Sequence, residues 1–348
     1  MPRGLYEVTQ CALYKINSKA RLAGLLHVSV PVMLGMASSR KYQEFTLKEK
    51  VCPFGGKSRK ARMVQTPTEA LRPLHDRIHD LLRRCAPPNY AHAAVKGRSY
   101  RTNAEAHKGS CVAATFDLES FYSSTSETTV FRFFVDQMKC APDIASLLAR
   151  LICVERDDSY PCLPTGSPLS PLISVYANKP MFDKFAHLAE THALSFTCYV
   201  DDLTFSGLAM PKGLERMVTS VAKRYGHTLA THKTMTFGPS SAKHITGVVI
   251  FNGKITVPNA RFRKARKIQA AINAENDPIK KISLMQKLSG LLGEAAYLDN
   301  RYSNLAKKAQ HSMSEFRLNS PAITMSAIPV TQEDASKAGF VLTNDVPF

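Results

Sequence analysis

The chain has 348 residues, of which 44% are hydrophobic, so it can bury a large core as one domain or as two or three subdomains. Lysine and arginine number 46 against 28 acidic residues, a formal net charge of +18. An excess this large favours a polyanionic partner, and nucleic acid over a membrane, because the basic residues are spread along the chain. A merely soluble basic protein is the alternative.

The eight cysteines form no CxxC pair and no His/Cys spacing typical of zinc. We expect them to be reduced and the protein to be cytoplasmic, since the sequence does not begin with a secretory leader. The apolar run 22–37 is about as long as the shortest membrane span, but His27, Ser29 and Pro31 interrupt it. We predict a core helix broken at the proline and no membrane partner.

The predicted elements of the first half begin with helices from residue 5, followed by the short extended piece YQEFTL. A basic hairpin with a Gly-Gly turn, VCPFGGKSRKARMVQTP, comes next. Apolar residues at helical spacing predict a helix over 68–85. A strand follows at 111–118, then two helices, SETTVFRFFVDQM and IASLLARLIC.

The second half is predicted to open with a loop, DDSYPCLPTGSPLSP, and one long helix over about 171–191. FTCYVDDLTFSG forms two strands that turn at or near the aspartates, and GLERMVTSVAKRYG forms a helix. Short strands precede a basic helical region over 259–310, and the tail after Ser320 receives no assignment. A small antiparallel sheet with helices on one side belongs to the α+β class.

Two adjacent carboxylates, Asp201 and Asp202, interrupt an apolar strand, where they repel each other and lose hydration. Bound Mg²⁺ would compensate, because hard cations prefer oxygen ligands. Two ions about 4 Å apart can stabilise both the attacking and leaving oxygens of a phosphoryl transfer. That arrangement needs a further carboxylate from a neighbouring strand, and Asp117 ends another apolar strand.

Three segments in the correct order resemble the motifs of reverse transcriptases: FDLESFY, LPTGSPLSPLISVYAN and YVDD. The stretch KSRKARMVQTP is similar to the basic segment that precedes them in that family. Asn103-Ala104-x-x-His107 and HITGVVI resemble two signatures of bacterial retron reverse transcriptases. The resemblance covers about residues 5–310.

The resemblance implies a right-hand polymerase fold with N-terminal helices and fingers at 1–110, a palm at 111–250, a helical thumb at 251–320 and a tail at 321–348. It implies an RNA-directed DNA polymerase that starts from a guanosine 2′-hydroxyl. Such an enzyme copies its own noncoding RNA (msr-msd) into branched single-stranded DNA (msDNA). Its partners would be that RNA, the DNA product, deoxynucleoside triphosphates and a separate effector protein in anti-phage defence.

The resemblance also assigns the metal site. Asp117, Asp201 and Asp202 would be the catalytic carboxylates and the ligands of two Mg²⁺ ions, with Mn²⁺ as a substitute. The carbonyl of Leu118 would be an additional ligand.

Six residues match nucleotide-binding positions of the family. Lys60 and Arg62 would hold the triphosphate, and Tyr122 would exclude a 2′-hydroxyl. The backbone at Gly166 and Ser167 would approach the nucleotide, and Lys233 would protonate pyrophosphate. The alternatives are surface cations, a core tyrosine and a loop glycine.

Seven residues match positions that bind RNA: Asn103, His107, Thr246, Gly247, Arg261, Arg263 and Lys264. Asn103 and His107 lie one helical turn apart and could instead be a buried structural pair. Thr246 and Gly247 could form a tight strand bend. The three basic residues would follow the nucleic-acid backbone electrostatically.

Three positions depart from the family pattern: Thr165 replaces glutamine, Val200 replaces alanine, and Ile245 replaces valine. None of them is a metal ligand. Two alternatives stay open at this stage. One is another bacterial reverse transcriptase, of the group II intron or abortive-infection type. The other is an RNA-binding scaffold without catalytic activity.

Overall fold

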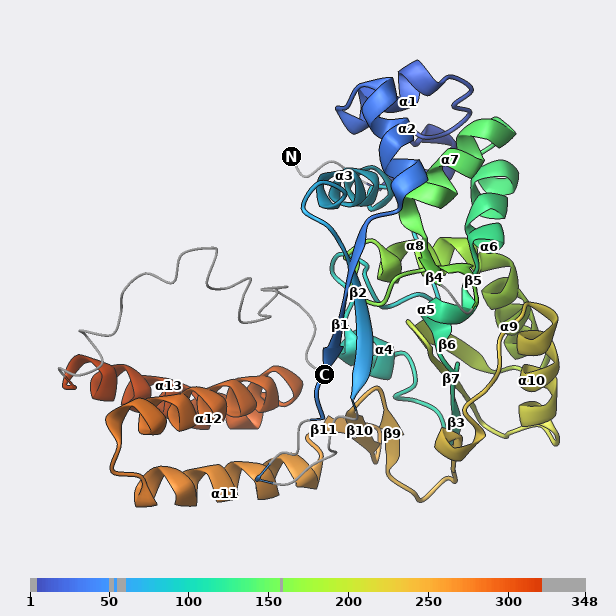
Figure 1. Cartoon of the computed structure of the whole chain (residues 1–348). Coiled ribbons are helices and arrows are strands. Elements are labelled where there is room, and N and C mark those ends of the chain that lie inside the picture. Colours follow the sequence, from blue (N-terminus) through green and yellow to red (C-terminus); the bar gives the residue numbers. More distant parts are fainter. Residues whose placement is uncertain (1–4, 50–52, 55–60, 157–158, 321–348) are drawn as a thin grey trace. The chain divides into compact units, whose positions relative to one another are not determined.

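The computed structural model describes residues 5–49, 53–54, 61–156 and 159–320. The chain forms two compact units, shown in Figure 1. The first consists of Met1–Glu49 and Lys60–Thr246, and the second of Lys50–Arg59 and Gly247–Phe348. Small antiparallel sheets combined with helices confirm the predicted α+β class.

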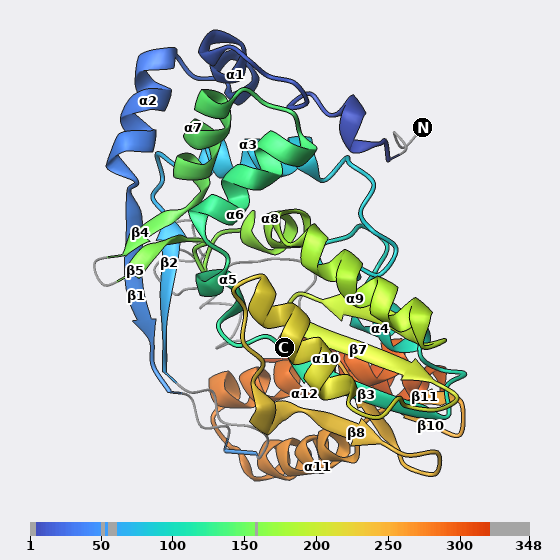
Figure 2. The same cartoon turned by 90° about the vertical axis from the view of Figure 1, so that its right-hand side faces the viewer.

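The central sheet of the first unit has the strand order β6-β7-β3-β8, and its strands pair antiparallel. Helices α9 and α10 cover one face of this sheet (Figure 2). Phe116, Leu203 and Phe205 point from the sheet into that layer and pack with Phe182 and Phe185 of α9. The elements are β3 (Val112–Asp117), β6 (Ser195–Tyr199), β7 (Asp202–Gly207), β8 (Met235–Phe237), α9 (Lys179–Thr191) and α10 (Leu214–Arg224).

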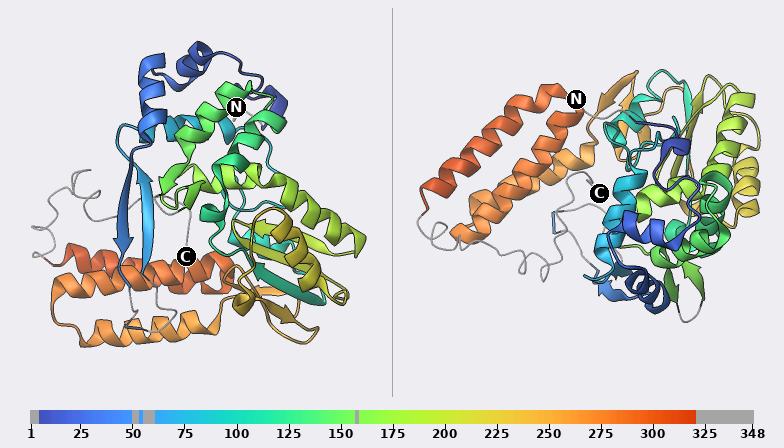
Figure 3. Two further views of the ribbon diagram at one scale, coloured as in Figure 1. Left: turned by 45° about the vertical axis from the view of Figure 1, so that its right-hand side comes forward. Right: turned by 90° about the horizontal axis from the view of Figure 1, so that it is seen from above.

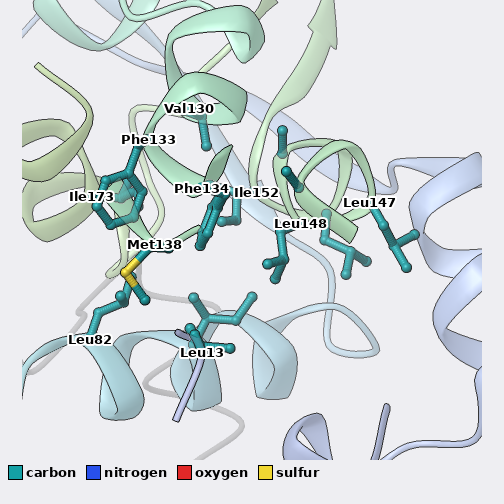
Figure 4. Packing of buried hydrophobic residues seen from close by; sticks show 14 of the residues in the cluster. Leu13, Leu82, Val130, Phe133, Phe134, Met138, Leu147, Leu148, Ile152 and Ile173 are labelled. Atoms are coloured by element: carbon teal, nitrogen blue, oxygen red, sulfur yellow. The ribbon is translucent and has the colours of Figure 1, made fainter. Parts of the chain in front are cut away.

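A second core of the first unit is built from connecting segments and, for the most part, from helices. Their apolar residues recur at helical spacing, so each helix turns one face inward. Figure 4 shows Val130, Phe133 and Phe134 packed with Leu148 and Leu13. The contributing elements are α1 (Lys19–Leu26), α2 (Val30–Ser39), α3 (Arg72–Leu82), α6 (Glu127–Arg132), the π-helical turn η2 (Phe133–Gln137), α7 (Pro142–Ile152) and α8 (Ser170–Ala177).

Two hairpins and several short elements complete the first unit. β1 pairs with β2 from Tyr42 opposite Pro67 to Leu47 opposite Arg62, and β4 pairs with β5. The short helix α4 begins with a capping box between Ser99 and Thr102. The bounds are β1 (Tyr42–Leu47), β2 (Arg62–Pro67), β4 (Val154–Arg156), β5 (Ser159–Cys162), β9 (Lys243–Ile245), α4 (Tyr100–Glu105), α5 (Phe121–Ser124), η1 (Val8–Gln10) and η3 (Thr231–Lys233).

The second unit contains one hairpin and a group of helices that lie side by side (Figure 3). Ile268, Leu288 and Leu292 form its small core, and Phe54 packs against this core. The Asp277 side chain caps α12 by accepting from the N–H of Ile279 at 2.9 Å. The elements are β10 (Val248–Phe251), β11 (Lys254–Thr256), α11 (Asn259–Ala274), α12 (Pro278–Leu298), η4 (Asn300–Tyr302) and α13 (Ser303–Leu318).

The single helix predicted over about 171–191 is wrong, because α8 ends at Ala177 and α9 starts at Lys179. Pro180 lacks the N–H that a continuous helix would direct at the Tyr176 carbonyl. That carbonyl accepts from the Gln137 side chain instead, at 3.1 Å. The predicted loop that follows residue 156 also contains a strand, β5, which carries Pro161.

The apolar run 22–37 is divided between α1 and α2, which are bent by 86° with Pro31 in the first turn of α2. It supplies Leu22, Met33 and Ala37 to the core. Within the described ranges no single helix is long and apolar enough to cross a membrane, and this bent pair passes that test only jointly.

Candidate active site

Three carboxylates are brought to one end of the central sheet. Asp117, the last residue of β3, lies directly opposite Asp202, the first residue of β7. Asp201 lies in the turn between β6 and β7, where Tyr199 pairs with Asp202. The N–H of Leu118 donates to the Asp201 carbonyl at 3.0 Å, which ties the chain after β3 to this turn. Side chains opposite each other on antiparallel strands have Cβ atoms about 5 Å apart.

The turn carries a backbone conformation that its residue does not favour. Val200 has a φ of 59°, in the left-handed region. A β-branched side chain there is a genuine outlier, and such strain costs about 1–3 kcal/mol. Strained residues of this kind cluster at functional sites. The conformation places Asp201 at the tip of the hairpin, beside the end of β3.

The environment of Asp201 disfavours its charged form. Burial, and then the nearby carboxylate of Asp117, raise its pKa from 3.8 to about 6. Negative charge therefore accumulates at this end of the sheet without full compensation.

Lys233 supplies part of the compensating charge. Its Nζ lies 2.7 Å from Oδ1 of Asp117, and this hydrogen bond raises the pKa of Lys233. The backbone positions it, because the Ala230 N–H donates to the Asp117 carbonyl at 2.8 Å. The N–H of Glu119 donates to the Thr228 carbonyl, also at 2.8 Å. The segment that carries Lys233 is thus fixed to the end of β3.

The donor set at this end fits a divalent cation in its chemistry. Carboxylate oxygens are the ligands that Mg²⁺ prefers, and the raised pKa of Asp201 marks an excess of negative charge that a cation would neutralise. Across the part of the chain that the structure describes, no three His, Cys, Asp or Glu side chains are already gathered at coordinating spacing.

Tyr122 and Arg62, two of the predicted nucleotide-binding residues, lie on different elements. Tyr122 lies in α5, just after β3. Burial, followed by Asp201, raises the pKa of its phenol, so it stays protonated. Arg62 begins β2 with an exposed side chain. Lys60 lies outside the described residues.

The loop at Thr165–Ser167 packs closely on β2. The Gly166 N–H donates to the Gln65 carbonyl at 2.9 Å. A Cβ on Gly166 would lie 2.8 Å from that oxygen and 2.5 Å from Cγ2 of Thr66, so only glycine fits here. Ser167 is buried and its side chain faces the interior. The loop therefore offers its backbone and Thr165 to the surface.

Comparison with known proteins identifies a family over the region that contains these motifs. A family model described as "Reverse transcriptase (RNA-dependent DNA polymerase)" matches residues 48–250. The chain belongs to this family. As a reverse transcriptase, it is an RNA-directed DNA polymerase.

Several curated relatives of this chain are retron enzymes. The Retron Ec86 reverse transcriptase of Escherichia coli is 25% identical over 65% of this chain and 68% of its own length. The Retron Se72 enzyme of Salmonella heidelberg is 25% identical over 64% and 59%. The Retron Mx65 enzyme of Myxococcus xanthus is 30% identical over 54% and 48%. The chain thus spans between about half and two thirds of these relatives.

The side chains of Asn103 and His107 are buried inside this reverse transcriptase. Both expose 0% of their surface. His107 Nδ1 lies 2.6 Å from the Ser206 hydroxyl, and Nε2 lies 2.7 Å from the Thr197 hydroxyl. Burial lowers the pKa of His107 to about 3, so the ring is neutral. This geometry favours the alternative of a structural pair, since direct contact with RNA would require both side chains to leave the interior.

Thr246 connects to the same segment. Asn103 Nδ2 donates to the Thr246 hydroxyl at 3.3 Å, and this hydroxyl donates to the Tyr100 carbonyl at 3.1 Å. Thr246 has a φ of 44°, and Gly247 has a φ of 77°. Consecutive left-handed residues describe a tight bend, at the point where the first unit ends and the second begins.

The three basic residues assigned to RNA differ in their surroundings within the second unit. Arg261 forms an ion pair with Glu294 at 2.8 Å, with both side chains 20% exposed. Arg263 is exposed on α11, and Lys264 is half-buried. Arg263 also lines a surface cavity of about 430 Å³ together with Asn259, Phe262, Arg266 and Tyr302.

Sequence reasoning missed two features of the site. The strained conformation of Val200 has no composition signal, because valine is an ordinary strand residue. The second is His75, whose Nδ1 lies 2.7 Å from the Ser167 hydroxyl in the loop at Thr165–Ser167. The sequence did contain a signal for it, because His75 lies on the apolar face of the helix predicted over 68–85.

Proposed function

We propose that this protein is a retron-type reverse transcriptase that copies part of its own structured noncoding RNA into branched single-stranded DNA. The supporting observation is the convergence of Asp117, Asp201 and Asp202 at one end of the central sheet. The central sheet with α9 and α10 would be the palm. The helical core and the β1–β2 hairpin would be the fingers, and the helices of the second unit the thumb.

In this proposal the aspartates hold two Mg²⁺ ions, with the Leu118 carbonyl as a further ligand and Mn²⁺ as a substitute. When bound, the ions stabilise the attacking hydroxyl and the pyrophosphate leaving group. Lys233 donates a proton to pyrophosphate. Its contact with Asp117 places it next to the carboxylates, which supports this role.

The incoming deoxynucleotide would lie between the carboxylates and the β2 strand. Arg62 and Lys60 contact its triphosphate, since guanidinium and ammonium groups suit phosphate oxygens. Tyr122 lies under the sugar and excludes a 2′-hydroxyl. The backbone of Thr165, Gly166 and Ser167 approaches the nucleotide from the β2 side.

The cognate RNA (msr-msd) would contact the second unit, where α11 carries Arg263 and Lys264. The bend at Thr246 and Gly247 would present the backbone to the same RNA. Retron relatives that are 25% and 30% identical to this chain support this subtype. A separate effector protein, a cytoplasmic location and a role in anti-phage defence complete the proposal.

The test is nucleotide incorporation by the purified full-length chain. A DNA primer annealed to RNA is incubated with deoxynucleoside triphosphates and Mg²⁺, in parallel with Asp201→Asn. Extension by the wild type and a loss of at least about 10³-fold in the variant are expected, because the carboxylate holds the ions. Equal extension by both proteins would contradict the proposal. No extension by either would favour the RNA-binding scaffold.

The retron subtype needs its own test. The protein is co-expressed with the DNA that flanks its gene, and nucleic acid is extracted from the purified complex. A DNA species that remains linked to RNA until a debranching enzyme is added supports the subtype. Unbranched DNA would point to another kind of bacterial reverse transcriptase.

A further inference from the structure

A chain of hydrogen bonds joins four parts of the first unit: α3, β1, the end of α7 and the loop at Ser167. His75 of α3 exposes 0% of its surface. Its Nδ1 lies 2.7 Å from the Ser167 hydroxyl, and its Nε2 lies 2.9 Å from the Leu151 carbonyl at the end of α7. The Tyr42 hydroxyl of β1 lies 3.2 Å from Nε2 and donates to the Ile152 carbonyl at 2.9 Å.

The partners of His75 determine its tautomer. A carbonyl oxygen only accepts, so Nε2 carries the proton and donates to Leu151. Nδ1 then accepts from the Ser167 hydroxyl, whose oxygen accepts from the Leu169 N–H at 3.1 Å. Burial lowers the pKa of His75 to about 4, so the ring remains neutral at physiological pH and keeps this arrangement.

The loop that His75 holds is also held from its other side. The Gln65 N–H donates to the Thr165 hydroxyl at 3.3 Å, and Gly166 donates to the Gln65 carbonyl at 2.9 Å. The loop therefore lies between β2 on one side and the imidazole of α3 on the other. Each contact limits how far the Thr165–Gly166 backbone can shift relative to β2.

We propose that His75 is a positioning residue for the incoming nucleotide. By accepting from Ser167, it sets the position of the Thr165–Gly166 backbone against β2 and so determines the affinity for deoxynucleoside triphosphate. This rests on the proposed function, which assigns that backbone to the nucleotide. His75 itself does not touch the reacting groups. Displacement by about 1 Å can cost up to about 100-fold in such sites.

The experiment measures single-nucleotide incorporation on an annealed RNA template and DNA primer. His75→Phe keeps the ring volume but removes both hydrogen bonds. We expect the KM for the nucleotide to rise about tenfold while kcat changes by less than about threefold, because ground-state and transition-state binding weaken together. His75→Gln, whose amide can both donate and accept, is expected to restore most of the wild-type KM.

Ser167→Ala tests the same bond from its other end and should reproduce the higher KM. If both residues act through this bond, the KM of the double variant is no higher than the higher of the two single-variant KM values. His79→Phe, one turn further along α3, serves as the control and should keep the wild-type KM. Thermal unfolding midpoints of all variants, measured beside the kinetics, separate loss of folding from loss of nucleotide affinity.

Two results would overturn the positioning role of His75 without contradicting the proposed function. One is an unchanged nucleotide KM in folded His75→Phe and Ser167→Ala while the wild type is active. The other is a double variant in which the effects of the two substitutions on KM add. If the wild type incorporates no nucleotide, the proposed function fails first, and this inference fails with it.

Discussion

Single side chains at the end of β3 determine the electrostatics of the site. Asp201 is half-buried beside Asp117, and its pKa is raised from 3.8 to about 6. The folded protein therefore binds this proton more tightly than the unfolded chain does. The contribution to stability is fully present below about pH 4 and is lost as the pH rises through 6.

Asp201→Asn is expected to stabilise the metal-free protein at pH 8 by roughly 3 kcal/mol, since the pKa of Asp201 is raised by about two units and one unit corresponds to about 1.4 kcal/mol. The free energy of unfolding is measured in urea with a chelator present, for both proteins, from pH 4.5 to 8. The difference should grow with pH. Addition of Mg²⁺ at pH 8 should stabilise the wild type alone. A difference that does not vary with pH would contradict the raised pKa of Asp201.

Lys233 offers a second prediction at this scale. Lys233→Met should lower kcat by about 100-fold if the ammonium donates a proton to pyrophosphate. Lys233→Arg keeps the charge beside Asp117 but holds its proton too tightly to donate it. Single-turnover rates of the two variants distinguish these roles. Recovery of the wild-type rate by Lys233→Arg would show that charge alone is needed.

The sequence carried much of the information on these residues. Apolar flanks around Asp117 and Asp201 already indicated a metal site, and the structure places both at one end of the sheet. The buried partners of His107 could not be predicted, because Thr197 and Ser206 lie 90 and 99 residues away in the chain. The same holds for His75 and Ser167, since tertiary packing alone brings them together.

At the scale of structural elements, the packing of the loop after β5 on strand β2 requires a close approach of their backbones at Gly166. Gly166→Ala would place a Cβ 2.7 Å from Cγ1 of Val64 and 2.8 Å from the Gln65 carbonyl. We expect a loss of about 1–3 kcal/mol in stability, as for other overpacked sites, together with weaker nucleotide binding. Urea unfolding and the KM for nucleotide check this.

Gly109→Ala is the matched control, because a Cβ there would meet no heavy atom within 4 Å. Its stability should stay within about 0.5 kcal/mol of the wild type. If both glycine variants unfold at the same urea concentration, the close approach of the loop to β2 is not limiting.

Elements were predictable where the pattern was regular. The β6–β7 hairpin and α10 follow from alternating and helical periodicity, and both are confirmed. The break between α8 and α9 was missed because apolar residues continue through Asn178, although Pro180 was a signal. β5 was missed because Pro161 and the flanking glycine and prolines are typical of loops.

At the scale of the whole molecule, the net charge of +18 predicts salt-dependent binding to template and primer. The affinity should fall steeply between 50 and 200 mM salt, because released counterions drive binding. Arg263→Ala should reduce the slope of log K against log salt by about one, as for a lost phosphate contact. Fluorescence anisotropy on a labelled duplex measures the slope.

Arg261→Ala provides the comparison, since Arg261 already pairs with Glu294 in the second unit. It should lower the stability of the protein and leave the salt slope nearly unchanged. Equal effects of both variants on the slope would show that the ion pair opens when nucleic acid binds.

The most direct measurement counts the divalent cations held by Asp117, Asp201 and Asp202. Mn²⁺ replaces Mg²⁺, and electron paramagnetic resonance quantifies the bound ions in the full-length protein with template, primer and a non-hydrolysable nucleotide. We predict two bound ions in the wild type and in Asp76→Asn, and a loss of binding in both Asp117→Asn and Asp201→Asn. Unchanged occupancy in those two variants would contradict it.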